Sequence, residues 1–179
     1  TMTTNKTAVV WSCGHAKPDF SNERFSWLGK FLYDIKPDYC IDLGDGADMA
    51  SLNSYDTRKP ENIVSQNYED DINSYTDSQE RIRHEFNKHK KRKPKFIGFE
   101  GNHENRIKTA IAHDPRVHGV RYGISFDHIN VRRFFDDYHE YSCGAPAIEC
   151  IDGVDYAHFI GAGNFGRPIS GVHHAFGLV

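Results

Sequence analysis

The sequence predicts an α/β fold from three observations. Three short apolar runs within residues 1–104 each lead directly into a loop that combines glycine with His, Asp or Asn. Segments with apolar residues at helical spacing separate these runs, which is the order of βαβ units in a parallel sheet. Two glycine-containing turns later in the chain separate further strand-like runs. We therefore expect a parallel sheet from the first part of the chain and a second sheet from the last part.

Strands and helices are expected to alternate in the first part of the chain. A β-branched, apolar run predicts a strand over 7–12. A helix is expected over 22–34, because its apolar residues have helical spacing and Pro37 follows it. A second buried strand is expected over 39–43. The polar segment 51–67 contains a proline and is expected to be a loop.

A long polar helix is expected over 68–93. Its thin apolar stripe is formed by Ile72, Tyr75, Gln79, Ile82 and Phe86, which predicts a helix on the surface. The segment ends in the basic run 88–93, immediately before Pro94. Cations at a helix C-terminus complement the helix dipole, so this run is either a solvated cap or a patch that contacts phosphate.

The remaining elements are shorter. A buried strand over 96–99 is followed by a helix over 104–111 and a further helix over 125–135. Three strands are expected over 138–141, 147–151 and 154–159, and a glycine-rich loop over 161–171. The three late strands are expected to form the second sheet.

Composition indicates one globular domain over residues 1–179, with 38% hydrophobic residues and a net charge of -3. No apolar stretch approaches the roughly 20 residues of a membrane span. The N-terminus has no apolar signal segment, so we expect a cytoplasmic protein without a membrane partner. The cysteines have no metal-type Cys-x-x-Cys spacing and are expected to be free thiols: Cys13, Cys40, Cys143 and Cys150.

Polar motifs follow the first three strands in order. They are Cys13-Gly14-His15, Gly44-Asp45-Gly46-Ala47-Asp48 and Gly101-Asn102-His103-Glu104, and His158 follows a late strand. The carboxyl ends of neighbouring parallel strands share one edge of a sheet, so these motifs are expected to meet in one crevice. Imidazole with carboxylate suits Mn, Fe, Zn or Ni. Taken alone, the third motif is also compatible with an ordinary strand-to-helix turn that has Asn102 as N-cap.

These motifs resemble those of the calcineurin-like metallophosphoesterase superfamily. The form Gly101-Asn102-His103-Glu104-Asn105-Arg106 is most similar to small phage-type members. The resemblance implies two packed mixed β-sheets flanked by helices, an αββα sandwich. It also implies two divalent metal ions and a phosphorylated substrate, with nucleic acid and nucleotides among the candidates.

The resemblance assigns metal ligands residue by residue. His15 matches a ligand of one metal, and Asp45 matches the carboxylate that bridges both metals. Asn102 matches a ligand of the second metal, and His158 is the best match to a further ligand of that metal. A histidine satisfied within a strand is the alternative for His158.

The resemblance also assigns the catalytic and substrate-binding residues. His103 matches the residue that assists the leaving oxygen, and Asp48 matches the carboxylate that orients it. Arg106 and Arg167 are candidates for holding the substrate phosphate, because arginine pairs well with phosphate. For Arg106, an ordinary surface position on a helix is the alternative.

Two departures from the family pattern matter. Cys13 stands where the family has Asp, so it is either a soft metal ligand that favours Zn or Fe or a small buried thiol beside a weakened site. The family's Gly-His-x-His motif is missing: 171–174 reads Gly-Val-His-His. The domain is therefore expected to end before the last metal-binding motif.

The expected function is hydrolysis of a phosphomonoester or phosphodiester by a hydroxide that the metal ions activate. The alternatives are a catalytically impaired member of the same fold that acts as a binding protein, and a thiolate-containing hydrolase that uses Zn or Fe. The sequence assigns no oligomeric state.

Overall fold

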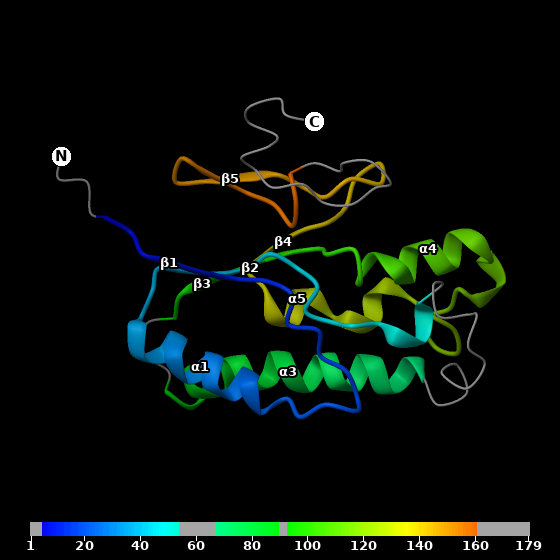
Figure 1. The fold of residues 1–179 in the computed structure, drawn as a ribbon, viewed down its shortest axis with the longest axis horizontal. Helices are drawn as coiled ribbons and strands as arrows, with labels where there is room; N and C mark the ends of the chain where they lie inside the picture. The colour runs from blue at the N-terminus through cyan, green and yellow to red at the C-terminus, as the bar shows by residue number, and fades with distance from the viewer. Residues whose placement is uncertain (1–4, 54–66, 90–92, 161–179) are drawn as a thin grey trace.

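A four-stranded parallel sheet lies at the centre of the fold (Figure 1). The computed structural model describes residues 5–53, 67–89 and 93–160. The strands follow chain order across the sheet: β1 (Ala8–Trp11), β2 (Tyr39–Asp42), β3 (Lys95–Phe99) and β4 (Asp137–His139). All three pairings are parallel, so the carboxyl ends of the four strands share one edge.

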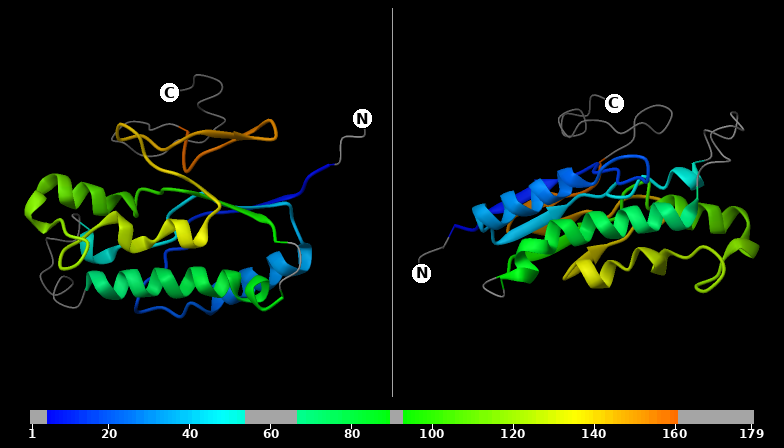
Figure 2. Two further views of the ribbon diagram at one scale, coloured as in Figure 1. Left: turned by 180° about the vertical axis from the view of Figure 1, so that it is seen from behind. Right: turned by 90° about the horizontal axis from the view of Figure 1, so that it is seen from below.

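Helices cover one face of this sheet (Figure 2). They are α1 (Glu23–Ile35), α3 (Tyr68–Lys88) and the short α5 (Val131–Phe134). The helices α1 and α3 cross closely at Gly29, where a Cβ atom would lie 2.6 Å from the carbonyl oxygen of Ile82. The core beneath them is aromatic and aliphatic, with Leu32, Phe86 and Phe96 among its buried members.

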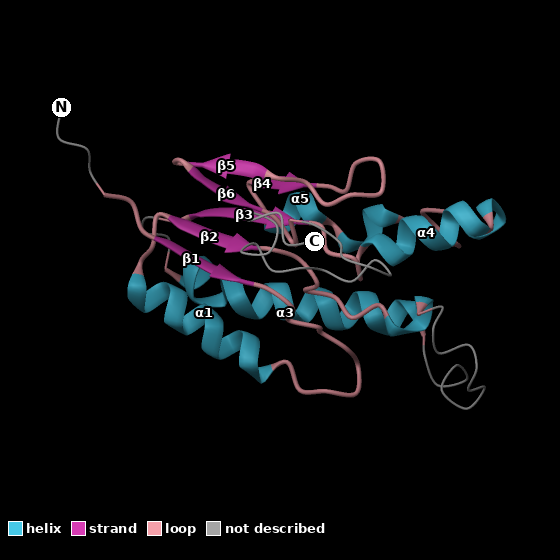
Figure 3. Cartoon of the chain, turned by 45° about the horizontal axis from the view of Figure 1, so that its top comes forward, coloured by secondary structure: helices cyan, strands magenta, loops and turns pink. Residues whose placement is uncertain are grey.

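The opposite face carries a two-stranded antiparallel sheet, as Figure 3 shows. Its strands are β5 (Glu149–Ile151) and β6 (Val154–Tyr156), joined by the predicted Asp152-Gly153 turn. Ile151 and Tyr156 pack against Ile41, Ile97 and Phe99 of the parallel sheet. Neighbouring residues of β2 therefore point to opposite faces, with Cys40 toward the helices and Ile41 toward the hairpin.

Short elements complete the part of the chain that is described. They are α4 (Asn105–His113) and the 3-10 turns η1 (Ala50–Leu52), η3 (Pro115–Val117) and η4 (Phe126–Ile129). The single helix predicted over 125–135 is wrong: η4 and α5 are separate, because Asn130 between them has a left-handed backbone with φ of 47°.

The prediction of an α/β fold with two sheets is confirmed, but the strand assignment needs one correction. β4 was expected in the second sheet, yet it pairs with β3 in the parallel sheet. The connection from β3 to β4 contains helices, and such a crossover joins parallel strands. The large sheet is therefore parallel rather than mixed, and the described second sheet has two strands.

The helix α3 also differs from its prediction. It ends at Lys88 rather than at residue 93. It is not a simple surface helix, because Tyr75, Gln79 and Arg83 on its inner face are buried. All four cysteines are free, as predicted. Within the described ranges, no helix has the length and apolar character needed to cross a membrane.

Candidate metal centre

Three loops at the carboxyl edge of the parallel sheet are joined to one another by hydrogen bonds. We call residues 12–16 the β1 loop, residues 43–49 the β2 loop and residues 100–104 the β3 loop. The N–H of His15 donates to the carbonyl of Asp45 at 2.9 Å, and the N–H of Asp48 donates to the carbonyl of Ala16 at 3.0 Å. These backbone bonds fix the first two motifs side by side.

Glu104 fastens the β3 loop to the β2 loop. One carboxylate oxygen, Oε2, accepts hydrogen bonds from the N–H groups of Asp45 and Gly101, each at 3.0 Å. The other oxygen, Oε1, accepts from the N–H of Ala47 at 2.8 Å. Glu104 is only 2% exposed, so its carboxylate is buried away from water. These hydrogen bonds replace the ones that water would have made.

The backbone is held in the left-handed region at three predicted ligands. The φ angles are 56° at Cys13, 45° at His15 and 56° at Asp45. Non-glycine residues seldom adopt this conformation, and each such residue raises the free energy of the fold by about 1–3 kcal/mol. Strain of this kind concentrates at functional sites, which agrees with the placement of these motifs.

One group of donor atoms joins the β2 and β3 loops to the end of the hairpin. The Nε2 atom of His158 lies 3.0 Å from Oδ1 of Asn102 and 3.3 Å from Oδ2 of Asp45. The other ring nitrogen of His158, Nδ1, lies 2.8 Å from the carbonyl of Leu43 and can only donate to it. In the neutral imidazole, Nε2 then carries a lone pair.

Three atoms with lone pairs therefore converge when His158 is neutral. Such a group is stabilised by a proton on Nε2 or by a cation placed among the three atoms. Imidazole, carboxylate and amide oxygen fit a divalent transition metal. The Leu43 carbonyl supplies the partner that orients a metal-binding histidine through its second nitrogen.

A second group shares Asp45. The ligand atoms of Cys13, His15 and Asp45 all lie within 4.8 Å of one another, which suits a single metal ion. Asp45 thus contributes to two adjacent donor sets, as expected for a bridging carboxylate. The alternative of a small buried thiol is wrong, because Cys13 is exposed, whereas Asp45 is buried.

His103 and Asp48 lie together, as predicted. The Nδ1 atom of His103 lies 2.7 Å from the Asp48 carbonyl and 3.4 Å from its Oδ1. The same Asp48 Oδ1 lies 3.2 Å from Nδ1 of His15, a contact that the sequence did not predict. His15, Asp48 and His103 form a further group that could hold a metal ion.

The pKa shifts favour the ionised form of Asp45 and Asp48 but disfavour that of Glu104. Hydrogen bonds to His103 and His15 hold the pKa of Asp48 far below its ordinary value of 3.8. Burial acts to raise the pKa of Asp45, but hydrogen bonds to His158 and to the backbone of His103 outweigh it and lower that pKa. Burial and the nearby charge of Asp45 raise the pKa of Glu104 to about 7.

Both histidines beside Asp45 have raised pKa values. Burial lowers the pKa of His158, yet its contact with Asp45 more than compensates. Burial likewise lowers the pKa of His103, but Asp48 and Asp45 outweigh that effect. A proton and a metal ion would therefore compete for the His158 nitrogen.

The Asn102 N-cap interpretation is wrong: α4 begins at Asn105, and its N-cap residue is Glu104. Arg106 is not an ordinary surface residue either. Its Nη1 donates to the carbonyls of Asp48 and Met49, at 2.8 and 3.2 Å, and its Nη2 lies 3.2 Å from Nε2 of His103. Arg167 and the segment 171–174 lie outside the described residues.

Sequence reasoning missed two contributors to the centre. Glu104 appeared in the sequence analysis only as part of a motif, and its hydrogen bonds to the β2 loop depend on tertiary structure that carries no sequence signal. The Leu43 carbonyl carries no sequence signal, because any residue supplies one. Comparison of the chain with models of known families, with curated proteins and with solved structures found no match.

Proposed function

We propose that this chain is a metal-dependent phosphoesterase with two divalent ions bound around Asp45. The observation that supports this most strongly is the position of Asp45 between two donor sets, Cys13 with His15 and Asn102 with His158. When bound, such ions would activate water and neutralise charge on the phosphoryl group.

The residues of the chain supply the remaining chemistry in this proposal. The Asp48 carbonyl accepts from Nδ1 of His103, so Nε2 is the nitrogen that would gain or lose a proton, and in the neutral ring it accepts from Nη2 of Arg106 at 3.2 Å. That atom lies 4.0 Å from Oδ2 of Asp45, so it faces the metal centre. His103 would give its proton to the leaving oxygen, and Asp48 would hold the ring in position. Arg106 is held by the Asp48 carbonyl and would turn from Nε2 of His103 to the substrate phosphate when His103 is protonated.

Hydrolysis of bis-p-nitrophenyl phosphate and p-nitrophenyl phosphate after loading with Mn, Fe, Zn or Ni tests the proposal. We expect activity that a chelator abolishes and that His103→Gln lowers by about 100-fold or more, as for loss of a general acid. His113→Gln is the matched control, because His113 lies at the last residue of α4. Metal-independent turnover, or full turnover in His103→Gln, would exclude this mechanism.

The position of Cys13 bears on the alternative of an impaired, binding-only protein. Its thiol lies close enough to His15 and Asp45 to bind a metal with them, which favours a ligand role over a lost site. Replacement by aspartate separates the two possibilities. A gain in turnover of at least tenfold in Cys13→Asp would identify the natural site as impaired.

The substrate class that we propose is a phosphate ester, with nucleotides and nucleic acid as candidates. Only part of the basic run 88–93 lies in the described structure, so the test is made on the whole chain. Binding of single-stranded DNA or RNA should weaken steeply with salt if lysines contact phosphates. Weak, salt-independent binding would favour a small phosphate ester instead.

A further inference from the structure

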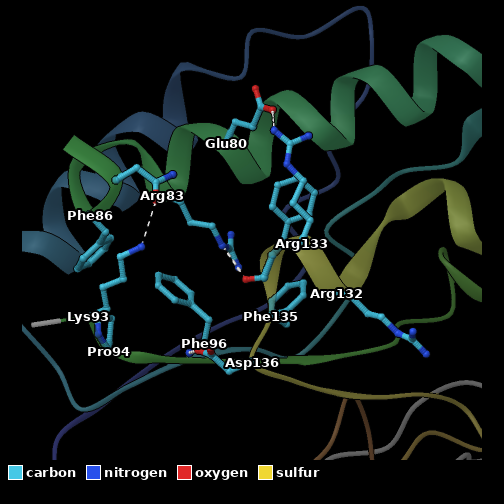
Figure 4. A pocket seen from close by; sticks show the side chains of 12 residues that line it. Glu80, Arg83, Phe86, Lys93, Pro94, Phe96, Arg132, Arg133, Phe135 and Asp136 are labelled. Atoms are coloured by element: carbon cyan, nitrogen blue, oxygen red, sulfur yellow. Dashed lines mark hydrogen bonds and ion pairs between the residues drawn. The ribbon is translucent and has the colours of Figure 1, made fainter. Parts of the chain in front are cut away.

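A cavity of about 230 Å³ lies between α3, the start of β3 and the segment that joins α5 to β4 (Figure 4). Phe96, the second residue of β3, lines it, whereas Asn102 follows the carboxyl end of that strand. A strand rises about 3.3 Å per residue, so the cavity and the metal centre lie toward opposite ends of β3. No residue of the metal centre lines the cavity.

Arg83 is the buried polar residue of this cavity. It is only 7% exposed. Its Nε donates to the carbonyl of Phe134 at 2.7 Å, and its Nη1 donates to the side-chain oxygen of Gln79 at 2.7 Å and to the Gln79 carbonyl at 3.2 Å. Its Nη2 is buried and has no hydrogen-bond acceptor in the described structure. A buried donor without an acceptor is uncommon in a folded protein.

The charge of Arg83 also lacks a close counter-ion. Across the described ranges, no carboxylate forms an ion pair with it, and Asp42 and Asp136 act on it only from a distance. Burial lowers its pKa to about 10, so the guanidinium stays protonated at neutral pH. Its close neighbours are aromatic: the rings of Phe96 and Phe135 lie 4.3 and 4.9 Å from the guanidinium carbon.

Further cations surround the cavity. Arg132, Arg133 and Lys93 line it with Arg83, and the acidic residues are Glu80 and Asp136. Arg133 is paired with Glu80, and Asp136 accepts a hydrogen bond from the N–H of Phe96 at 2.8 Å. The contact of Lys93 with Asn87 is a long one, 3.5 Å from Nζ to the side-chain oxygen. Figure 4 shows the Arg132 side chain pointing away from the others, so Arg83, Arg133 and Lys93 against Glu80 and Asp136 leave an excess of one positive charge.

We propose that this cavity binds a small phosphate monoester, with the phosphate toward Arg83 and Lys93 and the organic group against Phe86, Phe96 and Phe135. A phosphate monoester carries about -1.5 to -2 charges near pH 7 and has three acceptor oxygens, so it can accept from both the unpartnered Nη2 of Arg83 and the Lys93 ammonium. The planar guanidinium is suited to phosphate oxygens. A volume below the roughly 300–1,000 Å³ of drug-sized sites selects a small ligand. This site does not depend on the function proposed for the metal centre.

Isothermal titration calorimetry on the whole chain tests the proposal. The protein is treated with a chelator first, so that metal ions in the other site cannot bind phosphate. The probes are phenyl phosphate, inorganic phosphate and benzoate at constant ionic strength. We expect one phenyl phosphate per chain, bound more tightly than either inorganic phosphate or benzoate. Direct titration is preferred to thermal shift, because phosphate salts also raise protein stability without a specific site.

Two variants and two controls assign the binding to this cavity. Lys93→Ala, at an exposed position, should weaken phenyl phosphate binding about fivefold or more, and Arg83→Gln should weaken it about tenfold or more. Lys30→Ala and Arg116→Ala remove the same charges from exposed positions elsewhere, and binding should be unchanged. Circular dichroism establishes that each variant is folded. If Arg83→Gln fails to fold, Lys93→Ala decides.

Two results would overturn the proposal. One is the absence of saturable phenyl phosphate binding in the chelated wild-type protein. The other is wild-type affinity in folded Lys93→Ala, together with wild-type affinity in Arg83→Gln wherever that variant folds. Equal affinity for benzoate and phenyl phosphate would contradict the assignment of a dianionic ligand.

Discussion

The carboxylate of Glu104 accepts a hydrogen bond from the backbone N–H of Asp45 at 3.0 Å, across 59 positions of the sequence. The bond joins a helix N-cap on the β3 loop to the residue that both metal donor sets share. Asp45 in turn contacts the β3 loop: its Oδ1 accepts a hydrogen bond from the backbone N–H of His103 at 2.8 Å. The geometry of the proposed metal centre therefore depends on a residue outside both donor sets.

Glu104→Gln should destabilise the fold by about 2–4 kcal/mol at pH 8, where the wild-type carboxylate is ionised. The amide has one acceptor oxygen, so at least one buried N–H group of the two loops loses its partner. Urea unfolding with a chelator present measures the change. Glu140→Gln is the control: its exposed ion pair with Lys108 should contribute about 1 kcal/mol or less. Equal stability of the two variants would show that Glu104 does not fasten the loops.

Gly101→Ala should abolish metal binding. A Cβ atom at this position would lie 2.2 Å from both the backbone nitrogen and Oδ1 of Asp45, so the β2 loop would have to move. Gly144→Ala is the control, because a Cβ atom there meets no atom within 4 Å and only the positive φ is strained. Metal affinity measured by competition with a coloured chelator should fall in the first variant only. Wild-type affinity in Gly101→Ala would contradict the described contact.

Metal affinity should fall with acid, beginning near neutral pH. A protonated imidazole cannot bind a metal, and the pKa of His158 lies above its ordinary value of 6.5. Binding is therefore strongest above this pKa and is lost as the pH falls through it. Zinc titrations at several values between about pH 5.5 and 8 measure the effect. In His158→Ala the affinity should be lower and its pH dependence shallower, whereas an unchanged profile would remove His158 from the site.

Cobalt binding should report a thiolate ligand. Cys13 shares a donor set with His15 and Asp45, and a metal-bound cysteine is deprotonated. The wild-type protein with Co²⁺ should show a near-ultraviolet band from thiolate-to-cobalt charge transfer. Cys13→Ser should lose this band, and Cys143→Ser, at another exposed free cysteine, should keep it. A band that persists in Cys13→Ser would exclude this ligand.

Much of the centre could be predicted from sequence, because its residues directly follow strands. Asp45 and His103 were placed by local features: an apolar run, then glycine, then a polar side chain. Parallel pairing of β1, β2 and β3 then brings those positions together. The contact of His158 with Asp45 adds a residue from the end of the hairpin to the same group of side chains.

The features that could not be predicted depend on tertiary contacts. β4 joins the parallel sheet through three residue pairs. A strand of three residues is too short for its hydrophobic pattern to indicate which strand it pairs with. Arg83 is buried although its charge predicts exposure, because its donors find Gln79 and Phe134 only in the folded chain. The break between η4 and α5 depends on the left-handed backbone angle of Asn130, and the sequence does not require that angle.

Metal stoichiometry measured by elemental mass spectrometry tests the central claim most directly. The protein is reconstituted with Mn, Fe or Zn in turn, and wild type is compared with Asp45→Ala and with Asp34→Ala, an exposed helical control. A shared Asp45 predicts two ions per chain in the wild type and in Asp34→Ala, and the loss of both in Asp45→Ala. No bound ion in the wild type, or unchanged binding in Asp45→Ala, would contradict a metal centre organised around this carboxylate.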